Sequence, residues 1–158
     1  MGFTVKTREV SGTQALSILQ EVYVKDLPSL IDRSIRTLHR RIAAQGGRAS
    51  GHPMVIYHGE VNEDSSGPVE VCLPVDRGTV EGGEEVRLIE LPGGTEAYTT
   101  ITEAQCRFPE ILRAYDAVHA WIAQSGRAVA GPPREIYFSD PGQSGGDTPF
   151  CDIAWPIR

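Results

Sequence analysis

The sequence contains few cysteines, few aromatic residues and no long apolar run. Its three cysteines, Cys72, Cys106 and Cys151, are an odd number without CxxC spacing, so we expect no metal site and free thiols. Free thiols fit a reducing cytoplasm. No segment approaches the roughly 20 apolar residues of a membrane span, and the N-terminus lacks the apolar region of a secretory signal. We therefore expect a cytoplasmic protein with no membrane partner.

Basic residues are fewer than acidic residues. The formal net charge of −6 argues against a nucleic-acid-binding surface, which needs clustered Lys and Arg. The basic segment "RSIRTLHRR" places its arginines largely on the outer face of a predicted helix, where they are most simply explained as solvated. No P-loop, dinucleotide-binding fingerprint or GxSxG motif is present, so no cofactor is expected. The hydrophobic share of 40% is that of a globular chain.

The sequence does contain an internal repeat. The segment "SGTQALSIL" recurs as "GGTEAYTTI", "GGRASGHPMVIYHG" recurs as "SGRAVAGPPREIYFSD", and "VEVCLPV" recurs as "CDIAWPI", in the same order and at a nearly constant offset. The two halves cover about residues 3–75 and 85–157. Each half is too small for a core of its own, so we expect both to form one domain over residues 1–158.

Each half predicts the order strand, strand, helix, strand, strand. Gly-containing turns at Ser11-Gly12 and Gly93-Gly94 predict a hairpin between the first two strands of each half. Apolar residues recur at helical spacing after Pro28 and Pro109, which gives each helix one face to bury against a sheet. The predicted strands are Phe3–Val10, Thr13–Val22, Pro53–Gly59 and Val69–Val75, then Glu85–Leu91, Thr95–Thr102, Arg134–Asp140 and Phe150–Ile157.

The predicted fold class is α+β. We expect duplicated βαββ-type units related by pseudo-two-fold symmetry, which share one antiparallel sheet with two main helices on one face. The seam between the helices is a natural place for a central ligand groove, although side chains could equally fill it.

Glu135 is the position at which the two copies differ most informatively. Its counterpart in the first half is Val55, so this strand position accepts an apolar residue and is expected to point inward. Tyr57 and Tyr137 follow two residues later, on the same face as Val55 and Glu135 respectively. An inward carboxylate needs a partner or a cationic ligand. The alternative is a glutamate that is exposed or paired with a nearby arginine.

Aromatic residues are concentrated in the second half. In our alignment Tyr98 replaces Leu16 and Trp155 replaces Leu73. Rings offer flat apolar area and cation–π attraction, which suit planar or cationic ligands, although ordinary core packing is the alternative. We predict that the ligand-binding residues are Glu135, Tyr137, Tyr57, Trp155 and Tyr98.

The inward face of the last strand stays open at this point. Ile153 and Trp155 alternate with Asp152 and Ala154, and either pair could face the helices.

The duplicated unit, the strand "GPPREIYFSD" and the terminal "CDIAWPIR" resemble the GyrI-like small-molecule-binding family. That family includes the effector-binding domains of multidrug-responsive bacterial transcription activators. The resemblance implies a ligand groove at the junction of two βαββ-type units. It also implies that the acidic residue of the "EIY" strand contacts cationic ligands, here Glu135 with Tyr137 beside it.

The resemblance implies a protein that binds lipophilic, often cationic small molecules. Because the first expected strand starts at Phe3, there is no room for a helix-turn-helix, so we expect a stand-alone member whose DNA reader, if any, belongs to a partner protein. Two alternatives remain open. One is a hydrolase of strained cyclopropane-bearing electrophiles that uses Glu135 and Tyr137 as catalytic residues. The other is a protein-interaction inhibitor of DNA gyrase.

Overall fold

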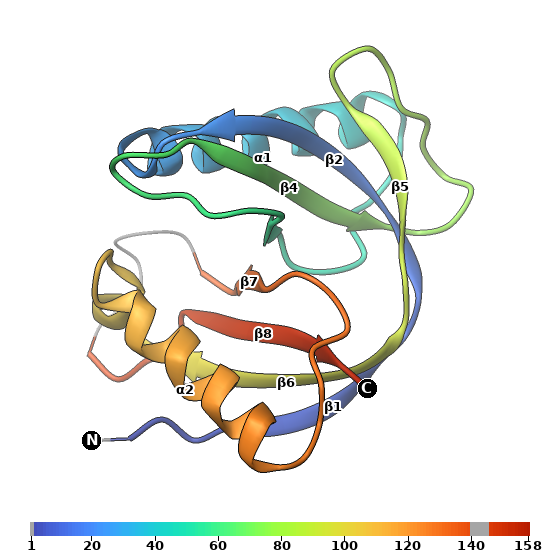
Figure 1. Cartoon of the computed structure of the whole chain (residues 1–158). Helices are drawn as coiled ribbons and strands as arrows, with labels where there is room; N and C mark the ends of the chain where they lie inside the picture. Colours follow the sequence, from blue (N-terminus) through green and yellow to red (C-terminus); the bar gives the residue numbers. More distant parts are fainter. Residues whose placement is uncertain (1, 140–145) are drawn as a thin grey trace. The chain divides into compact units, whose positions relative to one another are not determined.

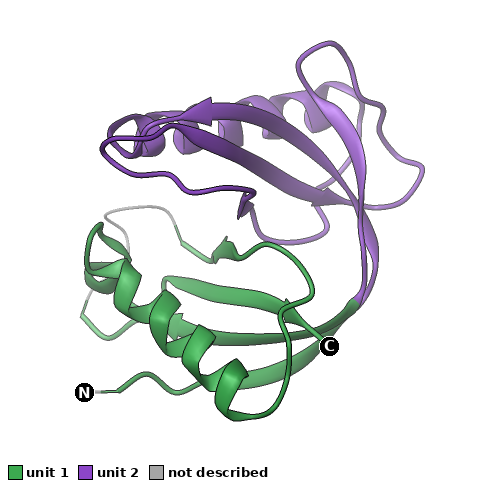
Figure 2. Ribbon diagram, in the orientation of Figure 1, with its two compact units in different colours: residues 1–10, 94–158 green, residues 11–93 purple. Residues whose placement is uncertain are grey.

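The chain divides into two compact units, drawn in different colours in Figure 2. The computed structural model describes residues 2–139 and 146–158. Unit 1 is assembled from Met1–Val10 and Gly94–Arg158, whereas unit 2 is the continuous stretch Ser11–Gly93. Within the described residues, each unit contains four strands and one α-helix (Figure 1). No helix in this part of the chain is both long and apolar enough to cross a membrane.

Unit 2 is an antiparallel sheet with one helix packed on it. The strand order is β3-β4-β2-β5, and α1 contacts β4 and β2. The helix buries Leu30, Ser34, Leu38 and Ile42, which recur every four residues and form one face. The elements are β2 (Thr13–Val22), a 3₁₀ turn η1 (Val24–Asp26), α1 (Leu27–Ala44), β3 (Met54–Tyr57), β4 (Gly67–Val75) and β5 (Arg87–Leu91).

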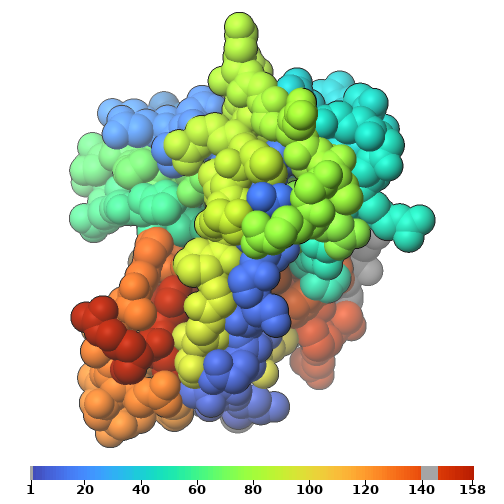
Figure 3. All heavy atoms as spheres, turned by 90° about the vertical axis from the view of Figure 1, so that its right-hand side faces the viewer, coloured from blue at the N-terminus to red at the C-terminus, as the bar shows by residue number. Residues whose placement is uncertain are grey.

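Unit 1 repeats this arrangement with the strand order β1-β6-β8-β7. Its helix α2 contacts β8 and β6 and buries Ile111, Ala114, Val118 and Ile122. Figure 3 shows the edge strand β1, in blue, running beside the yellow β6. The elements are β1 (Lys6–Val10), β6 (Gly94–Ile101), a 3₁₀ turn η2 (Ala104–Cys106), α2 (Ile111–Gln124), β7 (Arg134–Tyr137) and β8 (Cys151–Ile157).

The α+β class and the duplicated architecture are therefore confirmed. The predicted elements are all present, with bounds that differ by a few residues. The largest differences are at β1, which begins at Lys6 and not at Phe3, and at β7, which ends at Tyr137, whereas the prediction extended it to Asp140, a residue outside those described.

The two predicted hairpins are wrong. β1 pairs with β6 and β5 pairs with β2, so the first strand of each sequence half joins the second strand of the other half. A tight hairpin turn needs a left-handed backbone conformation, which Gly12 does not adopt. Instead Gly12 passes close to the chain at Gly93, where an added Cβ would lie 3.3 Å from the Gly93 backbone nitrogen. The glycine signal thus marks a close backbone approach rather than a reversal of direction.

Strand register assigns each paired strand residue of unit 1 to one of the two faces of its sheet. Directly opposed residues of an antiparallel pair point to the same side. The face that packs on α2, called the helix face, carries Trp155 opposite Ala97, and Ile153 opposite both Thr99 and Glu135. The other side, called the reverse face, carries Asp152 and its neighbours. The open question about the last strand is thereby answered, because Ile153 and Trp155 face the helix.

Register also corrects one pairing of the repeat. Pro74 and Pro156 are equivalent, and they stand opposite Ala15 and Glu96 respectively. The structural counterpart of Tyr98 is therefore Ser17, and our alignment of Tyr98 with Leu16 is wrong by one residue. Since the side-chain period of a strand is two, this single step moves Tyr98 to the reverse face.

Candidate functional site

Glu135 lies at the centre of the candidate site, on the helix face of unit 1. It is the second residue of β7 and stands opposite Ile153 on β8. Only 3% of the residue is exposed, although glutamate is rarely buried without specific partners. Tyr137 follows on the same strand and face, and α2 brings Tyr115 over the strand from the other side. The carboxylate is thus enclosed between the sheet and the helix.

Both carboxylate oxygens of Glu135 accept hydrogen bonds from tyrosines. The Tyr115 hydroxyl donates to Oε2 over 2.5 Å, and the Tyr137 hydroxyl donates to Oε1. Phenol hydroxyls carry no net charge, so these bonds orient the carboxylate and satisfy its oxygens without neutralising it. Strand alternation places Tyr137, whereas the packing of α2 places Tyr115.

Rings surround this carboxylate. The indole of Trp155 meets Tyr115 edge to face, with centroids 5.5 Å apart, and the imidazole of His119 lies 5.4 Å from the same indole. On the other side, Tyr137 meets Phe150 edge to face at 5.8 Å. Edge-to-face packing fixes the ring orientations. Trp155 is only half-buried, so part of this aromatic wall remains exposed.

The structure brings together three of the five predicted site residues. Glu135 and Tyr137 are joined directly, and Trp155 reaches them through Tyr115. Tyr98 lies on the reverse face, where the Arg8 guanidinium stacks 3.9 Å from its ring centroid. Tyr57 ends β3 in unit 2, opposite Val69.

Sequence reasoning missed Tyr115, His119 and Phe150. Tyr115 belongs to the apolar stripe of α2, so it could be taken for ordinary core packing. Its hydroxyl group could have indicated a role in the site, because a tyrosine on the buried face of a helix needs a hydrogen-bond partner for that group. The nearest carboxylate on the facing strand is Glu135.

A second buried acid in unit 1 has a structural role. Asp152, on the reverse face, accepts from Arg8 Nη1 over 2.8 Å and from the Thr100 hydroxyl over 2.5 Å. Arg8 also donates to Glu96 over 2.7 Å. Burial lowers the pKa of Arg8, but the bonds to Glu96 and Asp152 outweigh that effect and raise it overall. This network anchors the edge strand β1 to its sheet.

Unit 2 contains a buried acid at the place equivalent to Asp152. Glu70 contacts His58 Nε2 over 2.8 Å and Arg87 Nη2 over 3.2 Å. Burial acts to raise the pKa of Glu70, but the nearby Ser17 hydroxyl and the bonds to His58 and Arg87 outweigh it and lower the pKa below its ordinary value. The acid that occurs in both units is therefore in contact with an arginine in each. Glu135, by contrast, has no acidic counterpart, because unit 2 has Val55 at the equivalent place.

Unit 2 contains a pocket that does not include Tyr57, the site residue predicted for this unit. Its volume is about 360 Å³, and its lining includes Tyr23, Asp26 and Arg33. Among residues 2–139 and 146–158, no three His, Cys, Asp or Glu side chains form a group suited to a metal ion.

Solved structures with the same fold include proteins from several functional contexts. The C-terminal domain of EcmrR matches with a TM-score of 0.80 at 16% identity, over 100% of this chain and 99% of that one. In the EcmrR–DNA complex the chain covers 57% of the EcmrR chain. A hydrolase from Listeria innocua matches with a TM-score of 0.69 at 12% identity, over 99% and 93% of the two chains.

A third match is SAV2435, solved bound to tetraphenylphosphonium. Its TM-score is 0.58 at 12% identity, over 98% of this chain and 94% of that one. At these identities the likeness shows the fold alone. Among curated proteins, none matches the sequence.

The family comparison is more direct, because it is made with the sequence itself. The profile of the GyrI-like small molecule binding domain matches residues 4–158, which is nearly the whole chain and includes both units. The duplicated α+β architecture agrees with that match. The chain therefore belongs to the GyrI-like family of small-molecule-binding domains.

Proposed function

We propose that this chain binds lipophilic small molecules that carry a positive charge, and that Glu135 provides the counter-charge. The observation that carries the proposal is the environment of the Glu135 carboxylate. It is buried on the helix face, and both of its oxygens accept from uncharged tyrosine hydroxyls. A buried carboxylate is strongly stabilised by a cation brought next to it.

The surrounding rings support a lipophilic ligand. Trp155, Tyr115 and His119 form a connected aromatic wall, and the exposed part of Trp155 offers a flat surface. Aromatic faces attract cations and bury apolar groups without demanding one shape. Tetraphenylphosphonium, the ligand of SAV2435, combines a positive charge with four aryl rings and is a suitable first probe.

Calorimetric titration with a charged and a neutral ligand tests the counter-charge. Glu135→Gln should weaken tetraphenylphosphonium more than tenfold, or about 1.4 kcal/mol, and should change the affinity for neutral triphenylphosphine oxide little. The matched control is Glu85→Gln, which makes the same change of net charge at an exposed position of unit 2. Equal weakening of both ligands would rule out the counter-charge role.

A second candidate function is hydrolysis of strained, cyclopropane-bearing electrophiles. The specific observation in its favour is the direct hydrogen bond between the Tyr137 hydroxyl and Glu135. In such a reaction Glu135 would take a proton from water, the resulting hydroxide would form a bond to a ring carbon, and the ring C–C bond would break. Tyr137 would donate its proton to the leaving carbon. The fold match to the Listeria innocua hydrolase is compatible with this chemistry.

Product analysis separates the two candidates. Incubation with activated cyclopropanes should give a ring-opened product that has gained one water, and Glu135→Gln and Tyr137→Phe should each abolish it. Absence of product across a panel of activated cyclopropanes, with tetraphenylphosphonium binding intact, would leave binding as the function.

A further inference from the structure

Two of the three cysteines belong to one apolar cluster of unit 1. Cys106 ends η2 and Cys151 begins β8, yet Cys106 packs against the apolar cluster that contains Cys151. Cys106 thus belongs to the packed surroundings of Cys151, and its thiol is among the groups that influence the pKa of Cys151. Cys72, the third cysteine, is buried in β4 of unit 2. The pair therefore joins two segments that are far apart in the chain.

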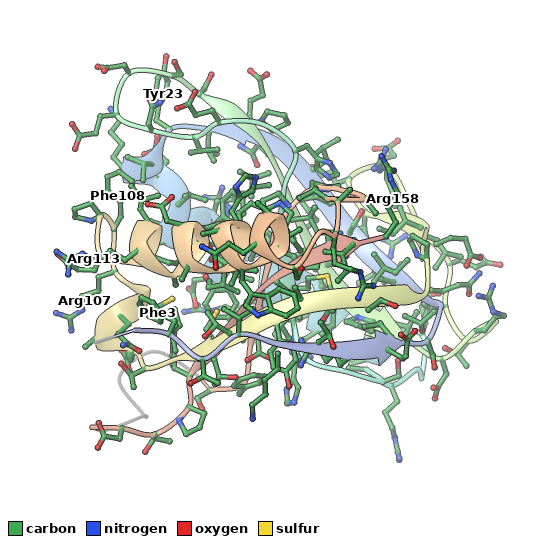
Figure 4. All side chains as sticks on the ribbon, turned by 60° about the horizontal axis from the view of Figure 1, so that its bottom comes forward. Phe3, Tyr23, Arg107, Phe108, Arg113 and Arg158 are labelled. Carbon is green, nitrogen blue, oxygen red and sulfur yellow. The ribbon has the colours of Figure 1, made fainter. Side chains whose placement is uncertain are left out.

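The two thiols differ in access. Cys151 is 0% exposed, whereas Cys106 is half-buried. The residues after Cys106 project from the start of α2 in Figure 4, where Arg107 and Phe108 are labelled, and Phe108 is 42% exposed. A small oxidant from solvent thus reaches Cys106 first. Burial, the neighbouring thiol of Cys106 and the charge of Glu135 raise the pKa of Cys151, which favours the protonated form of this second thiol.

We propose that Cys106 and Cys151 form a redox-modification site that closes into a disulfide when a peroxide reaches it. The sulfur of Cys106 attacks one oxygen of hydrogen peroxide, the O–O bond breaks, and Cys106 becomes a sulfenic acid as one water leaves. The sulfur of Cys151 then attacks the sulfenic sulfur, the S–O bond breaks, and a second water leaves. Two thiols are oxidised by two electrons in total, and one peroxide is reduced to two waters.

The site lies beside the candidate ligand site without being part of it. Cys151 stands opposite Tyr137 in the β7–β8 ladder, and η2 contacts α2, which carries Tyr115. A bond between Cys106 and Cys151 would fix η2 to β8, next to the two elements that hold the Glu135 carboxylate. Formation of this disulfide does not require a ligand at Glu135, because only the two thiols and the peroxide take part.

Peptide mapping of the wild-type protein is the test. The full chain is treated with hydrogen peroxide, the remaining thiols are alkylated, and the digest is analysed without reduction. We expect a linked peptide pair containing Cys106 and Cys151, with Cys72 alkylated. Sulfinic or sulfonic acid at Cys106 with Cys151 still alkylated would overturn the proposal. So would an unmodified Cys106 at peroxide concentrations that oxidise free glutathione in the same tube.

Three variants sharpen the result. Cys151→Ser should leave a sulfenic acid at Cys106 that dimedone traps, because no thiol remains to resolve it. Cys106→Ser should leave Cys151 as a free thiol after the same treatment. Cys72→Ser is the matched control and should form the bridge as the parent does. The wild-type map decides the proposal even if a variant fails to fold.

Discussion

Val55 and Glu135 occupy the same place in the two units. Val55 stands opposite Val71 in the β3–β4 ladder, Glu135 stands opposite Ile153 in the β7–β8 ladder, and both residues are buried. Unit 2 is thus an internal demonstration that this place in the fold does not need a charge. The carboxylate of Glu135 is consequently expected to cost unit 1 stability rather than to provide it.

The first prediction removes the carboxylate together with its two hydroxyl donors. The triple variant Glu135→Val, Tyr115→Phe, Tyr137→Phe should be as stable as the parent or more stable by about 1–4 kcal/mol, because a buried charge is exchanged for apolar contacts. Urea unfolding measures this. A loss of more than about 1 kcal/mol, the usual net contribution of one hydrogen bond, would show that Glu135 holds the fold together.

The second prediction concerns tryptophan fluorescence. The sequence contains two tryptophans, and only Trp155 contacts both Tyr115 and His119 in the described structure. A cationic aryl ligand bound at Glu135 should therefore quench Trp155. Trp155→Phe should abolish the quenching by tetraphenylphosphonium, whereas Trp121→Phe, its matched control on α2, should retain it. Quenching that persists in Trp155→Phe would place the ligand elsewhere.

The third prediction concerns the ion network on the reverse face. Arg8→Ala leaves Glu96 and Asp152 buried without the cation that both contact, and should destabilise the protein by about 3 kcal/mol. The control is Arg77→Ala, whose ion pair with Glu90 is exposed and should change stability little. Thermal and urea unfolding of both variants provide the measurement, and equal losses would contradict the structural role of Arg8.

The fourth prediction follows from the lowered pKa of Glu70. A carboxylate whose folded-state pKa lies below its unfolded value of about 4.5 stabilises the fold above that pH, and the stabilisation disappears as the pH falls through the folded-state pKa. Glu70→Gln should therefore be less stable than the parent at pH 7. The two proteins should converge as the pH is lowered below about 4.5. A stability difference that grows toward acid pH would contradict the assigned direction.

The candidate site was partly predictable because the sequence contains its own comparison. Strand alternation and the counterpart Val55 were enough to predict that Glu135 points inward with Tyr137 beside it. Tyr115 was not predictable in the same way, because its contact with Glu135 depends on how α2 rotates and packs on the sheet. A helix pattern gives the buried face but not the atom that each side chain reaches.

The errors share one physical origin, which is that strand pairing is not a local property. The sequence aligns "SGTQALSIL" with "GGTEAYTTI" without a gap, yet the ladders shift this segment by one residue and move Tyr98 to the reverse face. The glycine turns likewise resemble hairpins locally. Long-range pairing of β1 with β6, anchored by Arg8, decides the topology instead.

The order of strands along the chain has a consequence for synthesis on the ribosome. Every strand of unit 2 lies within Ser11–Gly93, so this unit can fold while the remainder is still being made. Unit 1 must wait, because β8, the last strand to be made, occupies an interior place between β6 and β7. Until β8 (Cys151–Ile157) leaves the ribosome, the sheet of unit 1 that β1 joins is incomplete. A nascent chain stopped before β8 would expose the apolar stripe of α2 and would be a natural substrate for chaperones.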